Sequence, residues 1–318
     1  MSVNKKVLLL FFAIPCFYTL YGQQMPFSPI SYRIFSPFLI NPAIAGSKDF
    51  ISTDLLAGFN GRSYSQIISV NSRIAKKGIS YSGSSSDASF TNIGIGASAF
   101  NDSNNTDSTN TAGGSLALSY HIPLNNKNLS FISIGASFKG LYHYFHGDHD
   151  LNIPSKEFYF PNADAGIYLY SPRFFAGVSA TNFLSAPRDT VVLNPYQVPV
   201  SRQYNIVAGY KFILSRSLNL VLEPSIMILT DDSLHFDLKE SIEPVLKLYT
   251  GNFCLGTYFN DYNKVSFFFQ YRYPRFYIGT FFALPKDLPY FQKTPTVEIA
   301  VGINFSRNKS GYTQSWHW

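Results

Sequence analysis

The feature that most constrains the fold is an alternation of apolar with polar or small side chains, at a period of two, that recurs along most of the chain. In residues 129–142, Ile134 and Phe138 would lie on one face of an extended chain, and Ser133 and Lys139 on the other. Residues 111–122, 202–214 and 264–273 show the same pattern. Because successive side chains of a strand point to opposite faces, the alternation predicts β-strands with one apolar face.

The composition favours a membrane location for these strands. Charged residues make up 14% of the sequence and aromatic residues 17%, whereas a typical soluble protein carries about 25% charged residues. Beyond the start of the chain, no apolar run reaches the roughly 18 residues that a membrane-spanning helix needs. Low charge without long apolar runs is typical of strands with one face toward lipid and the other toward a lumen. A soluble all-β fold is the alternative.

The predicted strands are numerous enough to close a barrel. They cover residues 50–60, 64–75, 90–101, 111–122, 129–143, 162–170, 173–182, 203–214, 217–230, 235–249, 252–260, 264–273, 275–284 and 296–306. Most have the roughly 9–11 residues that cross an outer membrane at a tilt, and bacterial barrels have an even number of strands. The expected fold is therefore all-β, a transmembrane antiparallel β-barrel of about 14 strands with a short irregular N-terminal lead-in. Because strand boundaries predicted from sequence are uncertain by about 2–4 residues, 12–16 strands are possible.

The lengths of the connections favour the same fold, because such barrels have short periplasmic turns and longer outer loops. With a periplasmic N-terminus, the short connections are 123–128, 171–172, 215–216, 250–251 and Pro274. The long connections include 101–110, 144–161, 183–201 and 285–295. Residues 75–89 are a long exception on the expected periplasmic side, either a true loop or an extra hairpin that would change the strand count.

The N-terminus has the features of a secretory signal. Lys5 and Lys6 precede an apolar core at residues 7–14, and Gly22 is a small residue near the expected cleavage before Gln23. Loss of the two lysines lowers the formal charge from +6 to +4. This mild charge, without a basic cluster interleaved with aromatics, gives no indication of a nucleic-acid partner.

A lead-in segment follows, in which proline disfavours regular helix. Ser36-Pro37 and Asn41-Pro42 push the preceding residues toward extended backbone and remove backbone donors. The run Asn41, Pro42, Ala43, Ile44, Ala45, Gly46 resembles the mature N-terminus of the PorP/SprF family, outer-membrane proteins of the type IX secretion system and gliding machinery of Bacteroidetes, whose mark is Asn-Pro-Ala-x-Ala-Gly. We therefore divide the chain into a signal peptide (1–22), a plug-like lead-in (23–48), a barrel (49–306) and a C-terminal tail (307–318).

The resemblance extends along the mature chain. Asp164 and Gly166, followed by Gly177 and Ser179, resemble the central strand pair of the family. Pro224-Ser225 resembles the end of the next pair. Glu298 resembles the acidic residue of the family's closing His-Glu-Ile, although Val297 stands where the histidine is expected. These residues are expected to be structural or to bind partners.

The resemblance implies a non-enzymatic protein without cofactors. Family members are associated with export or surface retention of large adhesins that carry a type B C-terminal sorting domain, and with periplasmic ring and motor components. The implied partners are that domain, those components and membrane lipids, in the cell outer membrane after signal removal. The lead-in is expected in the lumen or at the periplasmic mouth.

Other kinds of site receive little support from the sequence. No catalytic motif is present; the nearest pair, Ser119 and His121, lies on the predicted lumen face, away from lipid. A polar cluster around His143, with His146, Asp148, His149 and Asp150, lacks a recognisable metal-ligand geometry, so no metal site is expected. Predicted lumen charges of both signs favour a partly filled interior or a wet lumen with scattered charges: Lys211, Glu223, Lys239, Glu243, Lys247, Arg272 and Glu298. The alternative function is an outer-membrane channel for small apolar solutes, similar to fatty-acid transporters.

Overall fold

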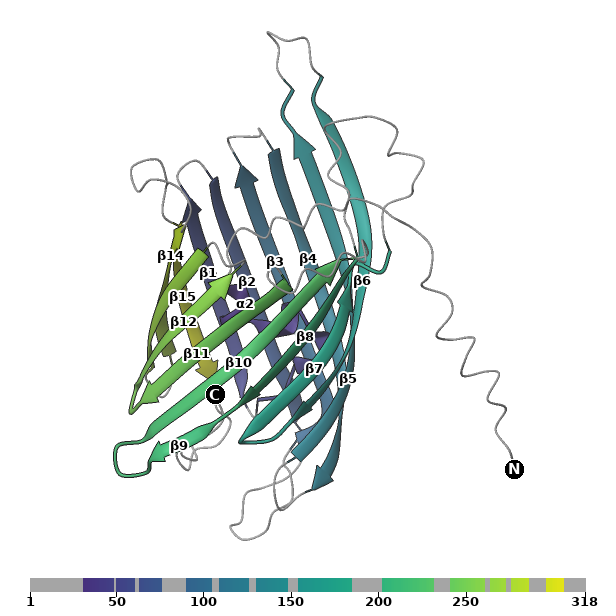
Figure 1. Ribbon diagram of the computed structural model, residues 1–318. Coiled ribbons are helices and arrows are strands. Elements are labelled where there is room, and N and C mark those ends of the chain that lie inside the picture. Colours follow the sequence, from purple (N-terminus) through teal and green to yellow (C-terminus); the bar gives the residue numbers. More distant parts are fainter. Residues whose placement is uncertain are drawn as a thin grey trace, which may run out of the picture.

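The computed structural model describes residues 31–48, 50–60, 63–75, 90–104, 109–125, 130–147, 154–184, 202–231, 241–260, 264–272, 276–285 and 296–305 (Figure 1). The lead-in forms three short turns: α2 (Tyr32–Phe35), η1 (Pro37–Leu39) and η2 (Pro42–Ile44). The strands that follow are β1 (Ile51–Asn60), β2 (Ser63–Ala75), β3 (Phe90–Asn104), β4 (Thr109–Asn125), β5 (Ser130–Phe145), β6 (Lys156–Tyr170), β7 (Phe174–Thr181), β8 (Gln203–Tyr210), β9 (Phe212–Ser215), β10 (Leu220–Asp231), β11 (Ile242–Thr250), β12 (Phe253–Asn260), β13 (Lys264–Arg272), β14 (Phe276–Pro285) and β15 (Thr296–Phe305). The expected signal peptide and C-terminal tail lie outside the described residues.

The strands form one closed antiparallel barrel. Apart from β8 and β9, each strand pairs with its neighbour in sequence, and β1 pairs with β15 from Ile51↔Phe305 to Phe59↔Val297. β8 and β9 both pair with β10 and are two parts of one strand, interrupted at Lys211. The barrel therefore has 14 strands, which confirms the predicted fold and strand number.

Three tight connections define one end of the barrel, its lower end in Figure 1: residues 171–173, 216–219 and 251–252. The opposite, upper end is where β7 ends and β8 begins, with residues 182–202 between them. These connections follow the predicted parity, but the upper end also has short connections, since two residues separate β1 from β2 and three separate β12 from β13. The exceptional connection lies at residues 76–89, outside the described residues, as do 126–129 and 273–275.

Several predicted strand boundaries were wrong, mainly because polar segments were assigned to loops. β6 begins at Lys156, not at residue 162, and its ladder with β5 continues to Phe145↔Lys156. The two strands extend past their neighbours at the upper end (Figure 1). Likewise β3 and β4 pair as far as Asn104↔Thr109, within the predicted loop 101–110. The ladder bonds only backbone groups, so it continues where the side chains become polar.

Two further boundaries differ in the second half of the chain. β10 begins at Leu220, after a turn over 216–219, where the sequence predicted a turn at 215–216. β11 begins at Ile242, and residues 232–240, which include the start of the predicted strand 235–249, lie outside the described residues.

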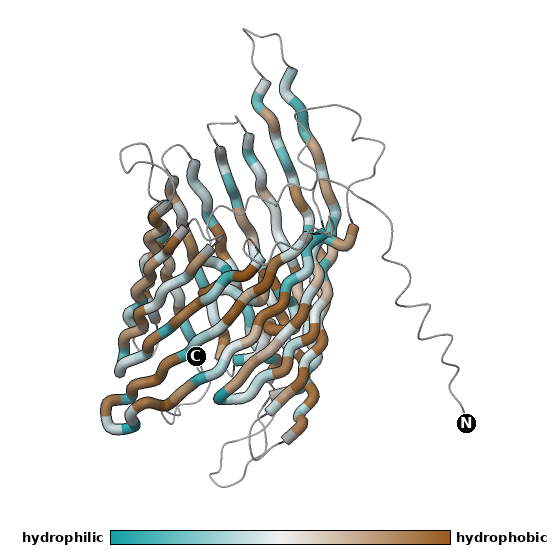
Figure 2. Tube along the Cα trace, viewed as in Figure 1, coloured by the Kyte–Doolittle hydropathy of each residue, from teal (hydrophilic) through white to brown (hydrophobic). Residues whose placement is uncertain are grey.

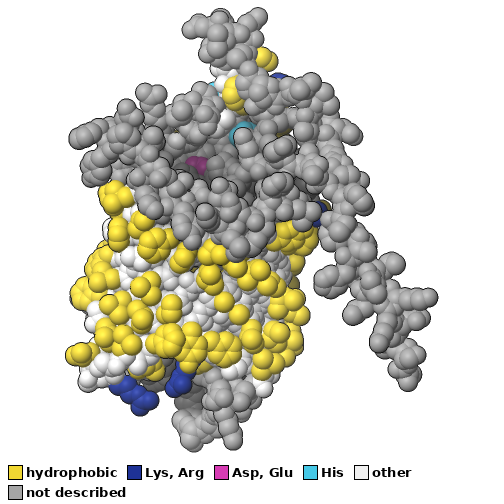
Figure 3. All heavy atoms as spheres, in the orientation of Figure 1, with side chains coloured by type: hydrophobic (Ala, Val, Ile, Leu, Met, Phe, Trp, Pro, Cys, Tyr) yellow, Lys and Arg dark blue, Asp and Glu magenta, His cyan; other side chains and the backbone are white. Residues whose placement is uncertain are grey.

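The two faces of the strands differ as the alternation predicts. In β5, Ile134 and Phe138 are exposed on the outside, whereas Ser133 and Lys139 are buried toward the lumen. Apolar residues recur along the strands, and apolar side chains cover much of the visible outer surface (Figures 2 and 3). No helix in the described part of the chain is long and apolar enough to cross a membrane.

The interior is packed rather than empty at the level of the lead-in. Tyr32, Phe35 and Ile40 of the lead-in share an apolar cluster with side chains of the wall, among them Tyr277 of β14 and Phe268 of β13. The rings of Phe35 and Tyr277 are stacked, with centroids 5.6 Å apart. α2 is seen inside the barrel in Figure 1.

Candidate functional site

The lead-in runs through the lumen from the upper to the lower end of the barrel. Its first described residue, Ser31, donates its backbone N–H to Glu298 Oε2 at 2.8 Å, near the start of β15. At its other end, the Gly46 carbonyl accepts from Arg73 Nε at 2.9 Å, near the end of β2. Between these points η2 packs against β4, β5 and β6. The lead-in therefore occupies the lumen itself, one of the two placements that the resemblance suggested.

The turns of the lead-in follow from its prolines and from Asn41. Pro37 and Pro42 each begin a 3₁₀ turn, a position where the missing N–H costs nothing. Asn41 caps the second turn, since its Oδ1 accepts the backbone N–H of Ala43 at 3.0 Å. Gly46 then takes a positive φ of 68°, which a side chain would disfavour.

Glycines on neighbouring strands leave room for this segment. A Cβ added to Gly94 of β3 would lie 2.2 Å from the carbonyl oxygen of Ala45, and one added to Gly135 of β5 would lie 2.4 Å from the backbone nitrogen of Ala43. On β6, a Cβ at Gly166 would lie 2.1 Å from Asn41 Oδ1. These three strands thus present bare backbone to the lead-in, which lets two backbones approach closely.

Asn41 is the residue that ties the lead-in to the wall. It is 2% exposed, and its Nδ2 donates to the carbonyl oxygens of Ile167 on β6 at 3.1 Å and of Val178 on β7 at 3.4 Å. Gly166 and Gly177 flank it: a Cβ at Gly177 would lie 2.9 Å from Asn41 Nδ2. Three predicted residues, Asn41, Gly166 and Gly177, are therefore brought together at one point.

Hydroxyl groups of the wall satisfy the carbonyl oxygens of the lead-in. Ser179 Oγ of β7 donates to Ile40 at 2.8 Å. Ser133 of β5 donates to Ala43 at 2.7 Å, and Ser119 of β4 donates to Ala45 at 2.6 Å. The backbone N–H groups of the lead-in donate to other carbonyls of the segment, such as those of Pro37, Asn41 and Pro42, so the wall hydroxyls supply the partners that these three buried carbonyls need.

The pair Ser119 and His121, whose Oγ and Nε2 lie 3.0 Å apart, serves the same purpose. Nε2 of His121 lies 2.9 Å from the Ala45 carbonyl oxygen, and its Nδ1 lies 2.9 Å from the Tyr170 hydroxyl. That hydroxyl also accepts from Arg73, whose guanidinium lies over the ring of Phe131. Both nitrogens of the imidazole are thus occupied within the wall.

An ion pair anchors the upper part of the lead-in. Arg33 Nη1 lies 2.6 Å from Glu243 Oε2 of β11 and 2.9 Å from the Tyr258 hydroxyl of β12, which itself donates to Glu243. Arg33 is therefore paired with a carboxylate inside the barrel.

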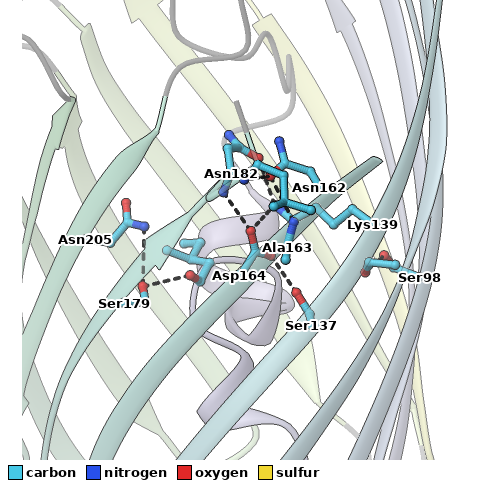
Figure 4. A network of polar contacts seen from close by, with 12 residues as sticks. Ser98, Ser137, Lys139, Asn162, Ala163, Asp164, Ser179, Asn182 and Asn205 are labelled. Carbon is cyan, nitrogen blue, oxygen red and sulfur yellow. Dashed lines mark hydrogen bonds and ion pairs between the residues drawn. The ribbon is translucent and has the colours of Figure 1, made fainter. Parts of the chain in front are cut away.

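Asp164, another predicted residue, organises a polar network beside the lead-in (Figure 4). Its carboxylate accepts from Ser137 Oγ at 2.6 Å and from the backbone N–H of Asn182 at 3.0 Å, and it lies 2.8 Å from Lys139 Nζ. Asn182 has a positive φ of 60°. The network therefore holds the end of β7 against β5 and β6.

The remaining predicted residues have different surroundings. Pro224 and Ser225 lie on β10, where Ser225 pairs with Gly209 of β8, and they form part of the wall. Ala43 and Ala45 are fully buried in the lead-in. Glu298 is the acceptor for Ser31 described above.

The lumen charges pair along the wall or with the lead-in. Glu223 lies 3.1 Å from Lys247 and 3.8 Å from Lys211, which come from neighbouring strands. These three charges therefore pair along the wall, because adjacent strands place them side by side. Lys239 and the side chain of Arg272 lie outside the described residues.

No group of three or more metal-ligating side chains is found within the described ranges. His143 and His146 belong to that part of the chain, whereas Asp148, His149 and Asp150 do not. His143 Nδ1 lies 2.8 Å from the Thr111 hydroxyl.

Sequence reasoning missed Arg33 of the lead-in and the wall residues of the site, above all Arg73, Ser133 and Gly135. A usable signal was present, because Ser133 and Gly135 share the predicted lumen face of one strand and small residues there leave space for another segment.

Comparison with known proteins gives a family. A family model described as "Type IX secretion system membrane protein PorP/SprF" matches residues 27–303. No curated protein matches the chain.

Several solved structures have a low similarity to this chain. They include the CymD monoaromatic hydrocarbon channel (TM-score 0.43, 12% identity, 85% of this chain and 92% of that chain covered). A second is CdiB from Acinetobacter baumannii (TM-score 0.40, 8% identity, 81% of this chain and 60% of that chain covered). A third is the NanC porin (TM-score 0.38, 8% identity, 80% of this chain and 98% of that chain covered). These distant similarities carry no argument about function.

Proposed function

The chain belongs to the PorP/SprF family of type IX secretion system membrane proteins, and from this premise we propose that it holds large surface proteins, or helps to export them, through their type B C-terminal sorting domain. Family and fold both point to the outer membrane. The role is non-enzymatic, and the further partners are periplasmic ring or motor components of the same system.

The observation that carries this proposal is the filled lumen. The lead-in crosses the barrel, hydrogen bonds tie it to the wall from β2 round to β7, and an ion pair ties it to β11. A barrel whose lumen is occupied by its own chain is suited to hold a partner at its surface rather than to pass a folded protein through its centre. The cargo domain would then meet the upper end, which corresponds to the outer side if short turns face the periplasm.

The main test is recovery of the partner from native membranes. The tagged barrel would be solubilised in detergent, captured and analysed by mass spectrometry. We expect a large surface protein, held through its C-terminal domain, to be recovered with it. Recovery of the barrel with only lipid or fatty acid would contradict the proposal and favour the channel for apolar solutes.

A matched pair of glycine variants tests whether the lead-in matters for holding cargo. Gly166→Ala places a methyl group against Asn41, whereas Gly140→Ala adds one to β5 where nothing lies within 4 Å. We expect the first variant to retain less surface protein on cells than the second at equal barrel abundance. Equal retention would show that the seated lead-in is not needed.

Conductance in planar bilayers separates the holder from the channel. We expect the full mature barrel to be closed and a variant lacking residues 23–46 to conduct ions, provided that it still folds. Steady conductance by the full barrel would contradict a lumen closed by the lead-in.

A further inference from the structure

A small cavity lies beside the beginning of the lead-in, on its upper side. Its volume is about 30 Å³, and its lining includes Arg33 and Ile40 of the lead-in, Lys139 of β5, Asn205 of β8 and Leu229 of β10. A single water needs about 10–15 Å³ by the same kind of measure, so the cavity has room for two waters or for one carboxylate group.

Asn205, which lines this cavity, carries an acceptor without a partner. The residue is 5% exposed, its Nδ2 donates to Ser179 Oγ at 3.4 Å, and its Oδ1 has no hydrogen-bond partner. The two ends of the amide can be told apart: Ser179 gives its own proton to the Ile40 carbonyl, so toward Asn205 it can only accept. The oxygen is therefore the atom that remains, and a buried acceptor without a partner calls for a donor.

The charges that line the cavity are both positive. Lys139 and Arg33 contribute to the lining, whereas their carboxylate partners, Asp164 and Glu243, do not. Arg33 also has a buried Nε–H without a hydrogen-bond partner. A ligand would thus meet two cations and one amide oxygen, with the neutralising carboxylates behind them (Figure 4 shows Lys139, Asp164 and Asn205).

We propose that this cavity binds the end of a polypeptide chain. The terminal carboxylate would accept from Lys139 and Arg33, and the N–H of the last peptide group would donate to Asn205 Oδ1. Charge-assisted hydrogen bonds of this kind are the strong ones, and they need only the small volume that the cavity provides. The rest of the peptide would extend toward the upper end.

The partner that would supply such an end is the cargo, whose sorting domain is C-terminal. This identification of the partner rests on the proposed function, whereas the chemistry of the cavity does not depend on it.

The test uses the full mature barrel in detergent and two probes, N-acetylglycylglycine and its C-terminal amide, titrated by saturation-transfer NMR. We expect the acid to bind about tenfold or more tightly than the amide, because only the acid carries the negative charge. Equal affinity, or no binding of the acid, would overturn the proposal and leave a cavity that holds water only.

Two substitutions at Asn205 locate the binding. Asn205→Asp puts a negative charge beside the carboxylate of the probe and is expected to weaken binding about tenfold or more. Asn205→Leu removes the acceptor without adding charge and should also weaken it. The matched control is Asn304→Asp, since Asn304 of β15 is also buried, with an Oδ1 that lacks a partner, but is not among the residues lining this cavity. If Asn304→Asp weakened probe binding as much as Asn205→Asp does, the assignment of binding to this cavity would be wrong.

Cargo retention by wild type and by Asn205→Asp separates the two proposals. If wild type holds cargo and Asn205→Asp does not, the cargo end occupies the cavity. If both hold it equally, the identification with the cargo is wrong. If wild type holds none while the acid probe still binds, the proposed function fails and the carboxylate site stands.

Discussion

Gly166→Ala should release the lead-in from the barrel wall. The added Cβ would lie 2.1 Å from Asn41 Oδ1 and 3.0 Å from the Cβ of Ser179. Asn41 has little room to turn away, because Gly177 lies against its other end. The methyl group and the Asn41 side chain therefore compete for the same space.

The expected magnitude follows from the hydrogen bonds that Asn41 would lose. Its side chain makes three: to Ile167, to Val178 and with the N–H of Ala43. At about 0.5–1.5 kcal/mol each, their loss destabilises the seated lead-in by about 1.5–4.5 kcal/mol. Since each 1.4 kcal/mol is a factor of ten, the displaced population should rise about 10- to 1,600-fold.

Thiol labelling measures that population directly. Ser36 is fully buried in the lead-in, so a Ser36→Cys thiol, in a Cys254→Ala background, should react with a maleimide only when the lead-in leaves its place. We expect the labelling rate to rise by that factor in Gly166→Ala and to stay unchanged in Gly140→Ala, the open-space control. Equal rates in the two alanine variants would refute the view that Gly166 makes room for Asn41.

Two further predictions concern charge and backbone conformation. Glu243→Gln leaves the buried charge of Arg33 without its carboxylate, so urea unfolding in detergent should show a free energy of unfolding lower by about 3–5 kcal/mol. Adding Arg33→Met should restore most of that stability. An equal loss in the double variant would contradict the pairing. Gly46→Ala should destabilise more than Gly251→Ala, by about 1–3 kcal/mol. Both glycines have positive φ, but only at Gly46 does a Cβ meet backbone, 2.6 Å from Gly94 Cα, so similar losses would argue against close packing there.

Much of the barrel could be predicted because its rules are local. The period of two decides which side of a strand meets lipid, as Ile134 and Ser133 show, and the spacing of turns decides the strand number. The errors came at segments such as residues 156–161, where Lys156, Glu157 and Pro161 suggested a loop. There the neighbouring strand β5 supplies the hydrogen-bond partners of the backbone, and the local sequence does not show that this strand lies alongside.

The site was predictable only in part. The family resemblance indicated Asn41, Gly166 and Ser179 as site residues. It did not predict that Asn41 contacts the barrel wall. Asn41 and Ile167, whose carbonyl it contacts, are 126 residues apart in sequence. Arg33 and Glu243 are 210 residues apart. Neither residue of that pair has a local pattern that predicts the other.

The sequence by itself determined that this chain forms an antiparallel barrel with an apolar outer face and an irregular lead-in rich in proline. Only the tertiary structure decided that the lead-in fills the lumen and that glycines and serines of β3 to β7 receive it. The physical reason is that the alternation of side chains is a property of each strand alone. The binding surface for the lead-in exists only after the sheet has closed, because closure brings glycine backbone and hydroxyl groups from several strands together on one part of the wall.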